Sequence, residues 1–332
     1  MVFRPLRGAE GPRPGLEAMQ KVQMTVLLAT RNGERVLART LEGYCRASAP
    51  PVAWKLVVVD NGSTDATPDI IEHFKRRLPL ESLVEPVTGK SRALNAGLYA
   101  VEGRIAVMTD DDAIPSPTFL AAWAKLLDHR TDYKLFGGSI DPLFDVAPPR
   151  WLAESKLRFA MMFAHRDLPE GPIGADEIYG PNMAVRTSVL DQGFQFDEKI
   201  GPNAEDPDYP TGGETDFCWR VAQSGAACWF AKEPLVHHIV RPEQLILRNW
   251  IRRAYRTGRG RAHQMWERGG AIIAPRLSLL QRMAMFSPIP RHRFDGASAY
   301  HLLRGFREEC ARRNAIGEVA TGAADPPRSP AR

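Results

Sequence analysis

Four short apolar runs, separated by segments with helical spacing, constrain the fold of this chain more than any other feature. The runs occupy residues 23–30, 54–60, 80–86 and 103–110. Segments with helical spacing or helix-start signals follow at 34–47, 61–78, 89–101 and 116–129. Continuous apolar strands that alternate with helices are typical of a parallel sheet covered on both faces. The sequence therefore predicts an α/β fold, with a mostly parallel sheet sandwiched by helices.

The remaining segments predict further elements of the same kind. Thr67 is an expected N-cap, with Pro68 in the first turn of its helix. Residues 134–144 indicate a strand pair. Residues 179–190 and 211–240 indicate a strand, a helix and a final strand that ends in His237 and His238, and residues 243–270 are helical and basic.

The charge of the chain is unevenly distributed. The net charge is +5, yet the residues from Arg241 onward contain 18 Arg and 7 acidic residues, which leaves the first 240 mildly acidic. We therefore expect a body over 21–240 and a basic helical extension over 241–316. Residues 1–20 and 317–332 have the composition of disordered tails.

Composition places the chain among folded soluble proteins, with 44% hydrophobic and 25% charged residues. Its four cysteines are scattered without a C-x-x-C pair, which indicates reduced thiols in a cytoplasmic setting. The N-terminal residues lack the apolar region of a signal peptide, and no apolar run is long enough for an ordinary membrane span. A membrane-associated location on the cytoplasmic face stays open.

Polar clusters follow three of the expected strands. Thr30, Arg31 and Asn32 follow the first, Asp60 closes the second, and Asp110 closes the fourth. In parallel sheets, ligands bind at the carboxyl ends of the strands. The three strand ends are therefore predicted to aim polar groups at one ligand site.

Asp110, Asp111 and Asp112 form an acidic triplet at the end of the fourth run. Like charges about 5 Å apart repel by roughly 3 kcal/mol near a protein surface. A solvated turn with charges pointing apart is one explanation. A divalent cation explains the triplet better, because carboxylate oxygens suit magnesium or manganese and a diphosphate commonly completes the shell.

The stretch TGKSRAL resembles the end of a phosphate-binding P-loop, but that motif requires glycine where Val84 stands. A P-loop is therefore excluded. Lys90 and Arg92 remain candidates for contact with a phosphate or a base, and surface charge is the alternative for both.

An ordered set of motifs carries a family resemblance. The pieces are LLATRNGE, VVVDNGSTD, GKSRALNAG, VMTDDDAIP, YGPNMAVRTSVL and GGETDFCWR, followed by a histidine. The first 240 positions resemble an inverting glycosyltransferase of family 2 with the GT-A fold. The resemblance implies transfer of a sugar from a nucleoside diphosphate sugar to a hydroxyl acceptor, with Mn²⁺ or Mg²⁺ as cofactor.

The same resemblance implies a donor-binding set. The positions that match the nucleotide and donor pocket are Thr30, Arg31, Asn32, Asp60, Lys90, Arg92, Asn95, Asp110, Asp111 and Asn182. Asp110 and Asp112 match the ends of the D-x-D signature, with Asp112 the more direct metal ligand. The histidine that joins the metal in related folds corresponds better to His238 than to His237, and a structural histidine is the alternative for either.

Counting back from Arg220 in GGETDFCWR places Glu214 on the catalytic-base position, with Asp216 as second candidate. Many family members have adjacent Glu-Asp here, and this chain has Glu214-Thr215-Asp216 instead. The alternative for both acids is simple stabilisation of a helix N-terminus by the helix dipole.

The basic extension allows several interpretations. Its arginines, among them Arg253 and Arg256, are candidates for contact with an anionic acceptor, and glycan or lipid-linked acceptors are what the resemblance implies. Residues 275–286 carry an apolar stripe flanked by arginines, which suits peripheral contact with an anionic membrane. No nucleic-acid-binding module is present.

The rival functions are a nucleotidyltransferase, which would need a glycine-rich basic signature near the first strand, and a noncatalytic nucleotide-sugar binder.

Overall fold

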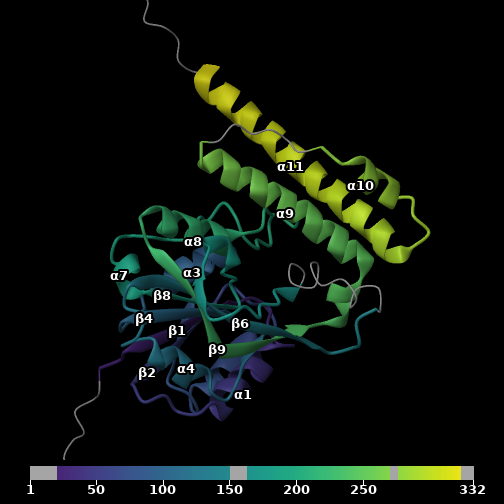
Figure 1. Ribbon diagram of the computed structural model, residues 1–332. Coiled ribbons are helices and arrows are strands. Elements are labelled where there is room, and N and C mark those ends of the chain that lie inside the picture. The colour runs from purple at the N-terminus through teal and green to yellow at the C-terminus, as the bar shows by residue number, and fades with distance from the viewer. Residues whose placement is uncertain (1–20, 150–162, 270–275, 323–332) are drawn as a thin grey trace, which may run out of the picture.

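The computed structural model describes residues 21–149, 163–269 and 276–322. Within them, nine strands form one mixed sheet in the order β3-β2-β1-β4-β8-β6-β9-β5, with β7 paired to β9 (Figure 1). The strands are β1 (Met24–Thr30), β2 (Trp54–Asp60), β3 (Leu80–Val84), β4 (Ile105–Asp110), β5 (Ala113–Pro115), β6 (Tyr133–Phe144), β7 (Gly171–Ile173), β8 (Asn182–Arg186) and β9 (Ala227–Val240). The helices of the body are α1 (Leu37–Arg46), α2 (Thr67–Phe74), α3 (Lys90–Leu98), α4 (Phe119–Lys125), α7 (Thr187–Leu190) and α8 (Gly213–Gln223), with a 3₁₀ turn at Ala175–Glu177.

The first four long strands are parallel and in register at their carboxyl ends. Thr30 lies beside Asp60, and Ala29 lies beside Asp110. β8 then runs antiparallel to β4. The predicted α/β class is confirmed, and the register brings three of the polar clusters to one edge of the sheet.

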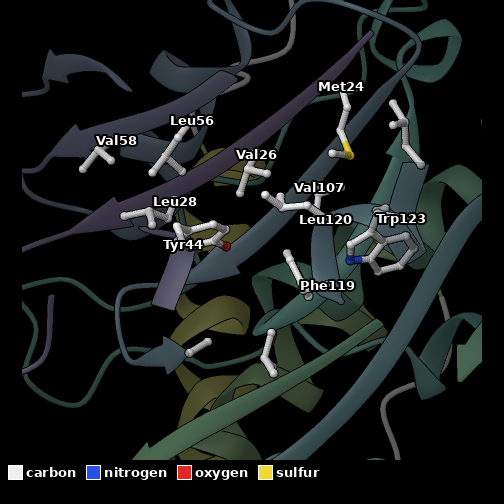
Figure 2. Packing of buried hydrophobic residues seen from close by; sticks show 14 of the residues in the cluster. Met24, Val26, Leu28, Tyr44, Leu56, Val58, Val107, Phe119, Leu120 and Trp123 are labelled. Atoms are coloured by element: carbon white, nitrogen blue, oxygen red, sulfur yellow. The ribbon is translucent and has the colours of Figure 1, made fainter. Parts of the chain in front are cut away.

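Helices cover both faces of the sheet, because alternate residues of each buried strand point to opposite sides. Residues of β1 illustrate this alternation: Val26 and Leu28 pack with α1, α2 and α4, whereas Leu27 packs with α3 and α8. Figure 2 shows the first of these cores, in which Tyr44 of α1 and Trp123 of α4 lie over β1, β2 and β4. This burial on both faces holds the strand ends rigidly.

The C-terminal extension consists of a 3₁₀ turn (Pro242–Leu245) and three helices, α9 (Leu247–Glu267), α10 (Leu279–Ala284) and α11 (Pro290–Gly322). α9 and α11 lie side by side, with α9 nearer the sheet (Figure 1). Two glycines of α9 allow close packing. A Cβ at Gly258 would overlap the Leu302 carbonyl of α11, and one at Gly260 would overlap the Thr211 carbonyl just before α8.

Several local expectations were wrong. Residues 134–144 belong to one strand, β6, whose pairing with β9 shifts register between Gly138 and Ser139 instead of turning back. Thr67 is the first residue of α2 rather than its cap, and its hydroxyl bonds the Asp65 carboxylate. α11 continues to Gly322, past the expected boundary at 316. The expected tail at 1–20, and residues 323–332 of the expected tail at 317–332, lie outside the described residues.

Candidate active site

The acidic triplet lies where β4 turns into the short strand β5. Asp110 is the last residue of β4, and β5 pairs antiparallel with β9 so that Ala113 lies opposite His238. The carbonyl of Asp112 accepts a hydrogen bond from the backbone N–H of Ile239 at 2.7 Å. The sequence pattern did not indicate β5, yet β5 decides which histidine reaches the triplet.

Each carboxylate of the triplet has a different partner. Asp110 Oδ1 accepts from Lys90 Nζ at 2.6 Å. Asp111 Oδ2 accepts from the Thr30 hydroxyl at 2.6 Å. Asp112 Oδ1 lies 3.3 Å from His238 Nε2. Side chains from three elements of the body therefore help to offset the repulsion among these carboxylates.

These partners separate the charge states of the three acids. Burial, reinforced by the neighbouring carboxylates, raises the pKa of Asp111 to about 7. Burial also raises the pKa of Asp110, although Lys90 opposes it. For Asp112, burial works upward, but the charge and hydrogen bond of His238 outweigh it and hold the pKa below its ordinary value. Asp112 is therefore the member of the triplet whose ionised form the site favours.

His238, not His237, faces the triplet, because neighbouring residues of a strand point to opposite sides. Its Nδ1 is 3.0 Å from the carbonyl of Phe163. Burial works to lower the pKa of His238, but Asp112 outweighs it and raises that pKa. The two histidines that sequence reasoning separated only slightly are thus clearly distinguished.

Glu214 joins the triplet through Lys90. It lies in the first turn of α8, and its Oε1 accepts from Lys90 Nζ at 2.7 Å. Burial works to raise the pKa of Glu214, but Lys90 outweighs it and holds that pKa below its ordinary value. Gly180 lies against this carboxylate, and a Cβ there would come within 2.7 Å of Oε1. One ammonium group thus bridges the triplet and the acid of α8.

Asp216, two positions further along α8, points elsewhere. It is buried, and its Oδ2 accepts from Arg220 Nε at 2.7 Å, one helical turn away. Residues two apart on a helix lie on nearly opposite sides. The structure therefore brings Glu214 to Lys90 and leaves Asp216 in an ion pair within its own helix.

A pocket of about 420 Å³ lies over these strand ends. Of the candidate residues, six line it: Thr30, Arg31, Lys90, Asp110, Asp111 and Asp112. Its other lining residues are Ala29, Asn61, Gly89, Pro202, Asn203, Ala204, Tyr209 and Arg241. The lining therefore combines the three carboxylates of the triplet with the cations Arg31, Lys90 and Arg241.

Other candidates hold the surrounding loops and do not line the pocket. The side chain of Asn32 accepts from the backbone N–H of Thr64 at 2.8 Å, and Asp60 Oδ1 accepts from that of Ser63 at 3.0 Å. Both thereby fix the loop after β2.

Arg92, Asn95 and Asn182 are likewise engaged outside the pocket. Arg92 pairs with Glu198, and Asn95 exchanges two hydrogen bonds with the backbone of Phe196. Asn182 is fully buried and donates to the carbonyls of Ser139 and Pro234. The amide of Asn182 thus joins strands inside the sheet, and its expected place near the donor sugar or acceptor stays a prediction.

Comparison with known proteins identifies the family. The family model described as glycosyl transferase family 2 matches residues 25–194, half of the chain. The chain belongs to glycosyltransferase family 2.

One curated relative aligns along most of the chain and another along about a third of it. Glycosyltransferase AglE of Haloferax volcanii is 24% identical over 285 residues, which cover 81% of this chain and 83% of AglE. Poly(ribitol-phosphate) beta-N-acetylglucosaminyltransferase TarS of Staphylococcus aureus is 29% identical over 117 residues, 34% of this chain and 20% of TarS.

Solved structures share the fold. Mannosyltransferase PcManGT from Pyrobaculum calidifontis, in complex with GDP-Man and Mn²⁺, superposes with a TM-score of 0.54 at 20% identity, covering 92% of this chain and 80% of that one. The structure of S. aureus TarS 1–349 gives a TM-score of 0.51 at 14% identity, covering 89% and 92%. The GT-A fold predicted for this family member is confirmed.

The family implies a divalent cation, and the acids of this chain fit one. Among the described residues, no three His, Cys, Asp or Glu side chains form a ready-made metal cluster. Magnesium is usually bound by one or two carboxylates together with substrate phosphates rather than by an all-protein cage. Asp112, ionised and lining the pocket, suits that arrangement. Asp110 pairs with Lys90, and His238 pairs with Asp112. The three predicted ligands Asp110, Asp112 and His238 therefore do not form a ready-made metal-binding cluster.

Sequence reasoning missed several lining residues of this glycosyltransferase. Asn61 donates to the carbonyls of Glu85 and Val87, and its Oδ1 accepts from Gly89, so it ties the loop before α3 to the end of β2. Its place in VVVDNGSTD was the available signal. Tyr209 and Arg241 lie outside every quoted motif and reach the pocket only through the tertiary fold.

No helix in the described part of the chain combines the length and apolar character needed to cross a membrane.

Proposed function

We propose that this glycosyltransferase moves a sugar, with inversion at the anomeric carbon, from a nucleoside diphosphate sugar to a hydroxyl acceptor, and that it requires Mn²⁺ or Mg²⁺. The observation that carries the proposal is the double contact of Lys90 Nζ, at 2.6 Å to Asp110 and 2.7 Å to Glu214. This contact places a carboxylate suited to act as base next to the acids suited to the diphosphate side.

In this proposal the nucleotide lies over the ends of β1 and β2. Thr30, Arg31 and Asn61 line that part of the pocket, and Asp60 lies directly below it at the end of β2. Arg31 already donates to the carbonyls of Asn61 and Gly62, which fixes its guanidinium at the rim. Asn32, Arg92 and Asn95 support the loops around the donor.

Asp112 would hold the metal, with Asp110 beside it near the ribose. When bound, a divalent cation supplies Lewis-acid stabilisation of the charge that develops on the leaving diphosphate. His238 favours the ionised form of Asp112. The contact of His238 with the Phe163 carbonyl holds the imidazole, and thereby Asp112, in position.

Glu214 would accept the proton of the acceptor hydroxyl. Its lowered pKa keeps it deprotonated at neutral pH, which is the form that a base requires. Lys90 holds the carboxylate in place before the acceptor arrives. A single displacement with the base opposite the leaving group inverts the anomeric configuration.

The proposed acceptor is a glycan or a lipid-linked hydroxyl compound in polysaccharide or glycoconjugate synthesis. Two arginines of the extension support an anionic character for it. Arg241 lines the pocket, and Arg253 is close enough for its charge to act on both Asp112 and Glu214.

The test is a thermal-shift panel of nucleoside diphosphates and diphosphate sugars, each with and without Mn²⁺, because ligand stabilisation grows as the logarithm of ligand concentration over Kd. We expect stabilisation only by matching nucleotides and a larger shift with metal. Asp112→Asn should remove the metal-dependent part, and the surface control Glu72→Gln should leave it unchanged. Tighter binding of triphosphates would favour a nucleotidyltransferase instead.

Turnover provides the second test. With the donor that the panel selects, slow hydrolysis followed by NMR should release a sugar of inverted configuration. A retained configuration would contradict a single displacement, and binding without any turnover would indicate a noncatalytic binder.

A further inference from the structure

Large apolar side chains of α10 and the following turn point into solvent. Their exposed fractions are 72% for Leu279, 78% for Leu280, 63% for Met283 and 85% for Phe286, and Ile289 is also exposed. We call these five residues the α10 apolar surface. Scattered exposed apolar residues are ordinary, but a cluster of this kind marks an interaction site.

The backbone of α10 lies close against α11 on one side, although no residue of this short helix is buried. A Cβ at Gly296 of α11 would overlap the backbone of Met285 and of Gln281. The helix also has a closed N-terminus, because the Ser278 hydroxyl accepts from the Gln281 N–H while the Gln281 side chain accepts from the Ser278 N–H. α10 is therefore a well-defined amphipathic element with its apolar side outward.

The charges around this surface have one sign. Between Glu267 and Asp295 the sequence contains five arginines and no acidic residue. Arg276 and Arg282, before and within α10, are exposed. Helices that lie in the interface of an anionic bilayer typically carry Phe and Leu on one side and arginine beside them.

The position of α10 leaves this surface accessible. It lies beside α11 at the outer end of the extension, with α9 between α11 and the sheet (Figure 1). α10 itself therefore lies apart from the sheet, and its apolar residues are exposed. A planar partner can reach them without disturbing the pocket.

We propose that the α10 apolar surface docks this protein on an anionic lipid bilayer, with Leu280 and Phe286 inserted at the headgroup–acyl boundary and Arg276 and Arg282 against lipid phosphates. This proposal is independent of the donor and the reaction. The chemistry of the surface favours a bilayer over a second copy of the chain, because two copies would bring like-charged arginines together.

The experiment is sedimentation of the full chain with vesicles of phosphatidylglycerol mixed with phosphatidylcholine, compared with pure phosphatidylcholine. We expect binding to the anionic vesicles, weakened by salt, and little binding to the neutral ones. Leu280→Ser with Phe286→Ser should weaken binding at least tenfold, since each buried methylene contributes to insertion. Val84→Ser with Tyr99→Ser removes equally exposed apolar side chains from the body and should change nothing.

Charge variants distinguish docking on anionic lipid from nonspecific hydrophobic adsorption. Arg276→Gln and Arg282→Gln should each weaken binding to anionic vesicles about fivefold, as expected for one surface arginine. Thermal unfolding of every variant checks that the fold is intact. Equal binding to both vesicle types, or no effect of the α10 variants, would overturn the proposal. The proposal would also be overturned if the protein bound no vesicles but self-associated, and if Phe286→Ser abolished that self-association.

Discussion

The pocket and the C-terminal extension use charge in opposite ways. In the pocket, every carboxylate of the triplet is partly buried and paired with a side chain from another element. In the extension, arginines divide into two groups. Arg259 is buried and pairs with Glu309 and Asp206, whereas Arg276 and Arg282 are exposed. Burial thus determines whether a charge is locked in place or left available for an outside partner.

The buried group attaches the extension to the body. Arg259 Nε lies 2.9 Å from Glu309 of α11, and its Nη1 lies 2.9 Å from Asp206 of the body. His263 of α9 contacts Asp197 of the body at 2.7 Å on one side and Arg313 of α11 on the other. Because Arg259, His263 and Glu309 are buried, their pairing favours one docked arrangement of the helices.

The largest expected effect separates the two acids of α8. Glu214→Gln should lower kcat by about 10²–10⁴-fold, the usual contribution of a general base, with an unchanged unfolding temperature. Asp216→Asn should instead cost about 1–3 kcal/mol of stability, because it weakens a buried acceptor of Arg220. Initial rates and thermal unfolding of both variants check this. If Asp216→Asn lost turnover but kept wild-type stability, Asp216 rather than Glu214 would be the base.

The second effect tests the buried arginine of the extension. Arg259→Ala should lower the free energy of unfolding by about 3 kcal/mol, because it removes the buried cation that pairs with both Glu309 and Asp206. Arg261→Ala, on the exposed side of the same helix, should leave it nearly unchanged. Urea unfolding compares the two. Equal losses would mean that helix propensity, rather than the ion pairs, holds the extension in place.

A pH-dependent effect is expected at the contact between Asp197 and His263. The hydrogen bond from His263 holds the pKa of Asp197 at about 2, below its ordinary value of 3.8. The ionised carboxylate therefore stabilises the fold above pH 4, by roughly 2 kcal/mol, and this contribution is lost as the pH falls through 2. Wild-type protein should exceed Asp197→Asn in stability at pH 7, and the difference should vanish near pH 2. A difference in stability that stayed constant between pH 7 and pH 2 would contradict a stabilising role for the ionised Asp197 carboxylate.

The smallest effect is expected for a surface pair. Arg35 and Glu243 are 2.9 Å apart, but their side chains are 63% and 51% exposed. Solvent and side-chain entropy offset most of such an interaction. Glu243→Gln should leave the unfolding temperature unchanged within error, and a clear decrease would show that exposure is a poor guide to the strength of ion pairs in this protein.

Much of the fold was predictable because its signals are local. Apolar runs and helical spacing located the first four strands and the helices between them. The family motifs placed Glu214 and Asp112 as candidates. Prediction failed where pairing partners decide the structure: Gly138 and Ser139 lie in a register shift that resembled a turn, and β5 is too short to leave a periodic pattern.

By itself, the sequence determined that the body is an α/β sheet and that acidic and basic residues meet at its carboxyl edge, because periodicity sets which way each side chain points within an element. Only the tertiary structure decided that His238 faces Asp112, that Glu214 reaches Lys90 while Asp216 does not, and which arginines are buried. The physical reason is that partners such as Lys90 and Glu214 lie far apart along the chain, so packing alone brings them together and sets their charges.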